Sequence, residues 1–548
     1  MRVRHLMLGE RVLITLLASL CLCCSCSEFD ASSREDYIGP KVSEPNTVSA
    51  AVVEVNTVNA AAPAAASQAA GGGGPLRMTV GQAMLSALEN NKSLVVQRFN
   101  PQIERTFEQQ ERAAFFEPVL TGELANEKNK ITTGPTNSEI NGTSVSVGVQ
   151  GLLPTGTTLG LTGTTAPVPL TDNDEYASRI AFSATQSLLR GLGSAVNLAS
   201  VNQARIDVKI SQYELRGFVQ SLVAQVEETY WDYALAERRI EIFNQSLELA
   251  EKQLQETRER INLGDLAPSE LPAAEAEVAV RREDLINARS TLAKTRLGLL
   301  RLINPPGVKL WNKEIALTSQ PISPSITLDD VESHVALALR MRPDLNQARL
   351  LRQRDELEVV KTKNGLLPKL DLFVTLGKSG YADSFGGSIK NIDDDNYDAI
   401  IGLAFEYPPS NRAAEARHLR AVLTRQQAGE AIDNLSQLIE VDVRSAYLEI
   451  ARSQEQVVAT AATSKLQEEK LRSETEKFRN GKSTSLLVAQ AQRDLVASQI
   501  SQVQAVVNYL KSLVEIYRLE GSLLERRGIA GPGGEPVRSS DTPLPTTD

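Results

Sequence analysis

The chain has 548 residues, a net charge of −10 and 5% aromatic residues. No segment concentrates the Lys and Arg that phosphate binding requires, which excludes a nucleic-acid-binding protein. Long stretches without Pro are rich in Ala, Leu, Gln, Glu and Arg, a composition that favours very long helices over a bulky globular core.

The N-terminus has the layout of a secretory signal peptide. Arg2, Arg4 and Arg11 accompany the apolar run at 12–20. All four cysteines follow this run and none lies further along the chain, so they cannot form a disulfide framework. They are Cys21, Cys23, Cys24 and Cys26.

Residues 1–26 resemble a bacterial lipoprotein signal, with Cys26 as the acylated residue and Cys24 as the alternative. The competing interpretation is a plain signal peptide. Residues 27–77 and 526–548 are predicted to be a flexible linker and a disordered tail. No later run of 18 apolar residues occurs, so we expect any membrane crossing to consist of strands.

The sequence between these extensions repeats itself. A shift of 217 residues places Tyr230 on Tyr447 and Gly264 on Gly481, whereas earlier matches need shifts of 248 to 250. This predicts a first repeat over 78–315 and a second over 325–525. It also predicts an insertion of about 30 residues in the first copy, between Pro118 and Tyr230.

Each copy is expected to open with a helix, at 80–116 and 328–366, and to continue into strands. Apolar and polar residues alternate over 370–376 and 399–405, and over 145–149 with a turn into 159–161. The latter hairpin is the insertion, either as an enlarged surface loop or as extra strands. Four principal strands per chain are too few to close a sheet in a membrane, so an oligomer is expected.

The longest predicted helices cover 197–262 and 411–479, and each would extend roughly 100 Å. Turns at Gly264 and Gly481 send returning helices back over 268–302 and 483–519. The two units therefore end in antiparallel helical hairpins.

This order of elements, together with the turn segments 261–271 and 478–487, resembles the outer membrane efflux protein (TolC-like) family over roughly 78–525. The resemblance implies a mainly α fold with β: a trimer whose 12-stranded barrel in the outer membrane continues as a helical tunnel across the periplasm. It implies a periplasmic adaptor and an inner-membrane pump as partners, an efflux or type I secretion role, and no cofactor or catalysis of its own.

The resemblance also directs attention to the periplasmic tips. The docking candidates are Gly264, Asp265, Leu266, Glu270, Gly481, Lys482 and Ser483. Leu487 and Gln490 stand where several family members carry acidic rings at the entrance, so the resemblance does not imply cation-selective gating here. The glycines are helix caps, adaptor contacts or both. Glu270 and Asp265 either pair with Lys482 and Arg479 or belong to solvated helix ends.

Other signals are set aside. Gly481-Lys482-Ser483 lacks the first glycine of a phosphate-binding loop, and three histidines support neither a metal cluster nor a catalytic triad. Asp393-Asp394-Asp395-Asn396 lacks the glycine and glutamate of a calcium loop and is expected to be a solvated turn. The alternative function is a lipid-anchored periplasmic coiled-coil adaptor without a pore.

Overall fold

The computed structural model describes residues 75–133, 136–168, 175–305, 310–324, 326, 328–393, 395–531 and 537. All of them belong to one compact unit that spans 59–548. Cys24, Cys26 and the rest of the signal segment lie outside the described residues.

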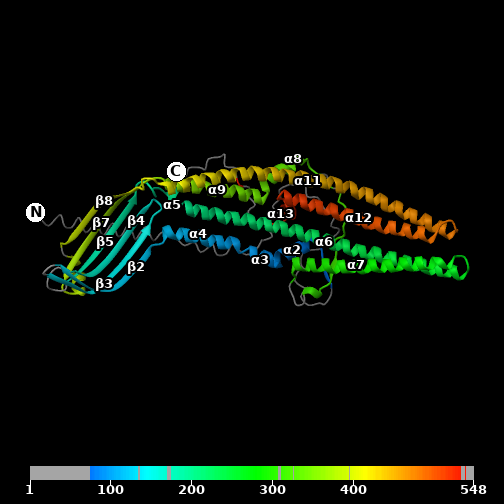
Figure 1. The fold of residues 1–548 in the computed structure, drawn as a ribbon, viewed down its shortest axis with the longest axis horizontal. Helices are drawn as coiled ribbons and strands as arrows, with labels where there is room; N and C mark the ends of the chain where they lie inside the picture. The colour runs from blue at the N-terminus through cyan, green and yellow to red at the C-terminus, as the bar shows by residue number, and fades with distance from the viewer. Residues whose placement is uncertain are drawn as a thin grey trace, which may run out of the picture. The chain divides into compact units, whose positions relative to one another are not determined.

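Two helical hairpins dominate the fold, as predicted (Figure 1). Helix α6 spans Ala199–Asn262 and is followed, after the short 3-10 turn Pro268–Glu270, by α7 over Leu271–Ile303. Helix α11 spans Arg412–Arg479 and is followed by α12 over Ser485–Leu519. Each returning helix packs along its long partner, which confirms the antiparallel arrangement.

The opening helix of each repeat is broken, which was not predicted. The first copy has α2 (Val80–Asn90), α3 (Lys92–Gln97) and α4 (Asn100–Phe116), and the second has α8 (Val331–Met341) and α9 (Pro343–Asn364). Asn91 leaves the helical conformation because its side chain caps the next helix through the amide of Leu94, at 3.1 Å. Arg342 is extended because it precedes Pro343.

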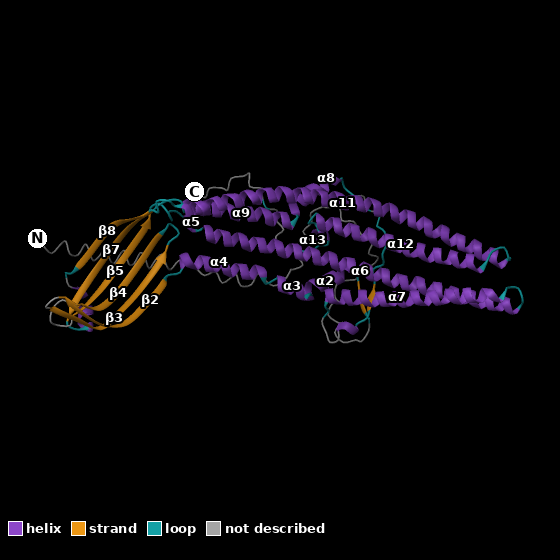
Figure 2. Ribbon diagram, viewed as in Figure 1, coloured by secondary structure: helices purple, strands orange, loops and turns teal. Residues whose placement is uncertain are grey.

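The strands form one six-stranded antiparallel sheet in the order β2-β3-β4-β5-β7-β8 (Figure 2). They comprise Val119–Thr133, Thr136–Leu152, Thr157–Val168, Glu175–Ser187, Lys369–Ala382 and Tyr397–Glu406. The sheet thus has two strands more than the four principal strands expected from the sequence. The insertion consists of extra strands, because β3 and β4 pair between β2 and β5.

The main core lies where the two repeats meet, around the middle of α6. Tyr230 is fully buried, and its hydroxyl donates to the carbonyl of Met78 (3.2 Å) while it accepts from the amide of Ser319 (3.1 Å). These contacts join α6 to a small parallel pair, β1 (Leu76–Met78) and β6 (Ile315–Leu317). Strand β1 begins inside the predicted linker, so that boundary was placed two residues too late.

The predicted tail also begins too early. After α13 (Leu523–Arg526), the Arg527 guanidinium donates two hydrogen bonds to the carboxylate of Glu227, at 2.7 and 3.1 Å. Ile529 packs against the main core. The chain is thus anchored on α6 beyond residue 526. The local composition did not predict this, because the contacts join residues that are distant in the sequence. Four short elements complete the described secondary structure: α5 (Ser194–Asn197), α10 (Phe385–Lys390) and the 3-10 turns Leu310–Asn312 and Asn391–Asp393.

Candidate functional site

The tips of both hairpins have the same backbone geometry. Gly264 and Gly481 have φ values of +82° and +71°, a region that glycine enters without steric penalty. The amide of Asp265 donates to the carbonyl of Arg260 (2.9 Å), and the amide of Lys482 donates to the carbonyl of Lys477 (2.8 Å). Both glycines therefore cap their helices in the Schellman arrangement, which ends each long helix and reverses the chain.

A small apolar cluster joins the two tips. Phe478 and Leu471 of α11 are buried against Val488 and Ala491 of α12, and Leu266 from the first tip packs on them. Leu266, a predicted docking residue, is thus partly buried within the chain. Its contact with the second hairpin holds the two turns together.

Arg260 of the first hairpin forms polar contacts with the second tip. Its Nη1 donates to the carbonyl of Phe478 and its Nη2 to the carbonyl of Arg479, each at 3.3 Å, and its guanidinium lies 5.0 Å from the centre of the Phe478 ring. Sequence reasoning missed this residue. A signal was present, since a basic residue, Lys477, occupies the equivalent position in the second repeat.

The predicted charge pairs across the tips do not form within the chain. Arg479 pairs with Glu476 of its own helix at 3.3 Å, and neither Asp265 nor Lys482 forms an ion pair within the described residues. Instead, the carboxylate of Glu270 accepts a hydrogen bond from the hydroxyl of Ser485. The two tips are thus joined by hydrogen bonds rather than by ion pairs.

Two hydrogen bonds at the second tip favour the charged form of one carboxylate, Glu474. Lys477 Nζ lies 2.7 Å from one oxygen of Glu474, and the hydroxyl of Ser483 donates to the other at 2.8 Å. The hydrogen bond from Lys477, followed by that from Ser483, lowers the pKa of Glu474. Ser483 therefore braces the turn that Gly481 creates.

Leu487 and Gln490 are exposed on α12 in the single chain. The opposite face of this helix carries Val488 and Ala491, which are fully buried against α11. One turn further along, Arg493 lies 3.8 Å from Glu277 of α7, a further contact between the hairpins. The packing thus leaves the side chains of both predicted gate residues exposed among the described residues and fixes the helix that carries them.

At the other end of this unit, one face of the sheet is mainly apolar and the other mainly polar. Ile401, Leu403 and Phe405 of β8 alternate outward and are more than 60% exposed. On the opposite face, Arg179 of β5 forms an ion pair with Asp398 of β8 at 2.5 Å. The pair crosses β7 at Gly377, where a larger residue would overlap it.

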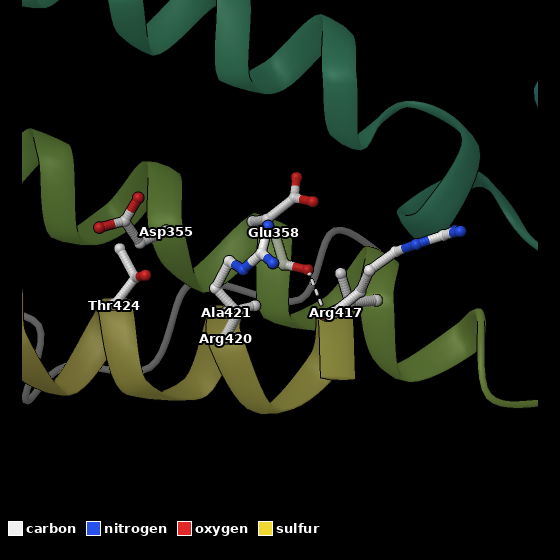
Figure 3. Close-up of a pocket in the computed structure, with 7 residues that line it drawn as sticks. Asp355, Glu358, Arg417, Arg420, Ala421 and Thr424 are labelled. Carbon is white, nitrogen blue, oxygen red and sulfur yellow. Dashed lines mark hydrogen bonds between the residues drawn. The ribbon is translucent and has the colours of Figure 1, made fainter. Parts of the chain in front are cut away.

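A cleft of about 310 Å³ lies between α9 and α11 (Figure 3). Asp355 and Glu358 line it from α9, and Arg417 and Arg420 line it from α11. Burial raises the pKa of Asp355, partly offset by Arg354. Glu358 already accepts a hydrogen bond from Gln203 at 3.1 Å. Both acidic side chains that line the cleft thus have partners within the chain, Arg354 for Asp355 and Gln203 for Glu358, so the cleft does not define a ligand site.

The described residues contain neither a metal site nor a helix suited to cross a membrane. No three His, Cys, Asp or Glu side chains gather there in a way that would hold a metal ion. No helix in the same part of the chain combines the length and the apolar character that a membrane span needs.

Comparisons with known proteins identify relatives of the whole arrangement. A family model described as outer membrane efflux protein matches residues 172–305 and 335–522. The outer-membrane channel OprN has 17% identity and a TM-score of 0.62, covering 81% of this chain and 90% of its own. VceC, an outer membrane protein from Vibrio cholerae, has 16% identity and a TM-score of 0.61, covering 81% and 96%.

The open state of the Neisseria gonorrhoeae MtrE outer membrane channel has 17% identity and a TM-score of 0.58, covering 89% of this chain and 97% of its own. At these identities the solved structures establish a shared fold. No curated protein sequence matches the chain.

Proposed function

Because this chain belongs to the outer membrane efflux protein family, we propose that three copies form an export channel that receives cargo from an inner-membrane pump through a periplasmic adaptor. The channel is passive, and the pump supplies the energy. Membership of the family makes the chain an efflux channel of the outer membrane. The trimer, the two partner proteins and the lipid anchor are our proposals.

The observation that carries the proposal is the sheet with its two faces and two free edges. The exposed apolar side chains of β8 suit lipid, whereas the Arg179–Asp398 pair suits a water-filled interior. Strands β2 and β8 each have only one neighbour in the described chain. Since an open edge in hydrocarbon leaves backbone groups without hydrogen bonds, the sheet needs further copies to close.

The long helices support the same conclusion. Several large apolar side chains of α11 remain more than half exposed in the single chain, and these are Leu419, Leu423, Leu438, Val441, Leu448, Val458 and Leu466. A 68-residue helix cannot bury them against α8, α9 and α12 alone. Neighbouring copies would cover them and form the wall of a tunnel.

The hairpin tips are the proposed adaptor contact. Gly264, Asp265, Glu270, Gly481, Lys482 and Ser483 shape the two turns, and Leu263 exposes 76% of its surface beside the first. Leu487 and Gln490 are the proposed entrance residues, where they would narrow the opening without a ring of acidic charge. Separation of the tips would require the contacts of Arg260 and Glu270 to break.

We also propose that Cys26, or alternatively Cys24, carries the lipid anchor, since both follow the apolar run of the signal segment. Labelling with a fatty-acid analogue distinguishes the two. The variant Cys26→Ala should lose the label, whereas Cys24→Ala should retain it. The reverse result would transfer the anchor to Cys24.

The function is tested by removing the anchor and asking what holds the protein in the membrane. Residues 1–26 are replaced by a cleavable signal peptide that contains no cysteine, and the outer membranes are washed at alkaline pH. A strand-inserted channel should stay in the membrane and conduct ions after reconstitution in planar bilayers. A protein that washes off as a soluble monomer would instead be the pore-free coiled-coil adaptor.

A further inference from the structure

The inserted hairpin occupies the interior of the sheet. Strand β3 pairs with β2 along the whole length Val119–Thr133, and β4 pairs with β5 along Thr157–Val168. Removing the hairpin would bring β2 next to β5, the arrangement of the second repeat, in which β7 pairs directly with β8. The hairpin therefore widens the sheet by two strands rather than decorating its edge.

The apolar side chains of the hairpin lie on the same, outward face of the sheet as those of the other strands. The registers place one apolar side chain of each strand opposite the next in an unbroken row across the sheet. The row consists of Leu120, Val149, Leu161, Phe182, Leu376 and Ala399. Val145, Val147 and Leu159 of the hairpin lie on the same face because alternate residues share a face. A surface loop outside the membrane would have no reason to continue this pattern.

The inward face is equally continuous. The next row in the register contains no large apolar side chain, and it consists of Thr121, Gly148, Thr162, Ala181, Gly377 and Asp398. Apolar residues outward and small or polar residues inward are the pattern of a barrel wall around water. The hairpin thus has the two faces that a segment of the wall needs.

The free edges are suited to join one copy to the next. Strand β2 begins beside the end of α4, and β8 ends beside the start of α11. The two edge strands run in opposite directions, so β8 of one copy would be antiparallel to β2 of another. Neither contains Pro, so every residue retains its amide donor.

We propose that the outer-membrane part of this channel is an 18-stranded barrel, with six strands from each of three copies and β8 of one copy paired with β2 of the next. This inference rests on the proposed trimer. It departs from the 12 strands that the family resemblance implied, and the difference is the hairpin at 136–168 in each copy.

The extra strands enlarge the exit. With a spacing of about 4.8 Å between strands and a tilt of about 40°, 18 strands give a backbone diameter of about 36 Å, against about 24 Å for 12. Barrels of this strand number leave an aqueous channel. The barrel then imposes little size selection, and the limit on cargo lies at the helical tips.

The direct test compares the full chain with a variant that lacks residues 136–168. Both are purified from membranes, and the barrel is imaged by single-particle electron microscopy. We expect a trimer in each case, with the barrel narrowed by about a third in the variant and the helical part unchanged. An equal barrel diameter in both trimers would place the hairpin outside the wall and overturn the inference.

A pair of point variants keeps the test decisive if the deletion does not fold. Leu161→Lys places a charge on the outward face of β4, whereas Thr162→Lys places it on the inward face of the same strand. We expect the first to reduce the amount of trimer in the outer membrane several-fold and the second to leave it near the wild-type amount. Equal amounts from both variants would show that β4 does not face lipid.

The two proposals fail in different ways. A wild-type protein that is monomeric after extraction contradicts the proposed function itself. A wild-type trimer with a barrel of 12 strands contradicts only the inference about the hairpin.

Discussion

Gly521 shows how strongly a single residue can be constrained in this chain. Its φ is +74°, and a Cβ atom there would lie 2.8 Å from the carbonyl oxygen of Met341. Its own carbonyl accepts a hydrogen bond from Gln220 at 2.7 Å. The residue thus fixes the end of α12 against both α8 and α6.

We predict that Gly521→Ala destabilises the protein more than Gly528→Ala does. Gly528 also has a positive φ, +67°, but no atom lies within 4 Å of the position that an alanine Cβ would take there. Both substitutions place alanine in the left-handed region, at about 1–2 kcal/mol, and only the first adds a clash of about 1–3 kcal/mol. Thermal unfolding followed by circular dichroism measures the difference, and equal melting temperatures would contradict it.

Glu227 gives the fold a pH dependence. Burial raises its pKa, and the pairing with Arg527 offsets this only in part. The folded state therefore binds the proton more tightly than the unfolded state does. The free energy of unfolding should fall as pH rises from the ordinary pKa of 4.5 through the raised value, and should then level off.

We predict that Glu227→Gln flattens this dependence, because the titrating group is removed. One proton contributes at most about 1.4 kcal/mol per pH unit. Denaturant unfolding at pH 5.0, 6.0 and 7.5 gives the slope of the free energy of unfolding against pH for the wild type and for the variant. The variant also loses its charge pair with Arg527, which changes the free energy of unfolding itself, so the slopes are the quantity to compare. Parallel slopes would show that Glu227 does not take up the proton.

At the scale of the elements, the two hairpins are held at their tips by contacts from Arg260. We predict that Arg260→Ala loosens the entrance. The loss of two hydrogen bonds and a ring contact, about 1–3 kcal/mol in total, would raise the open population about 5- to 150-fold. Conductance of the reconstituted channel in planar bilayers measures the effect.

Arg258 is the matched control. It lies on the same helix, but its partner is Glu275 of the same hairpin, at 2.7 Å. Arg258→Ala should leave the conductance near that of the wild type. Equal conductance in the two variants would mean that the contacts between the hairpins do not restrain the entrance.

The elements also show what could be predicted from the sequence. The bounds of α6, α11 and α12 agree with prediction within two residues, because apolar spacings of three and four, ended by glycine turns, are local signals. The breaks at Asn91 and Arg342 were missed, although Pro343 was a local signal for the second. The contacts of Arg260 were missed because they join residues more than 200 positions apart.

At the scale of the whole molecule, the strand count depends on a long-range pairing. The alternation over 145–149 was visible in the sequence, but a hairpin of this kind can lie in a loop or in the wall. Only the pairing of β5 with β7, which joins the two repeats, shows that all six strands form one sheet. The sequence therefore predicted the helical hairpins closely and left the width of the sheet open.

The central claim is that several copies of this chain close one channel, and the native mass of the detergent-extracted protein tests it most directly. The mass is measured after membrane purification, with the detergent contribution subtracted. Three copies of the 59.6 kDa chain, less the removed signal segment, are the predicted result. A monomer would leave both edges of the sheet open and contradict the account.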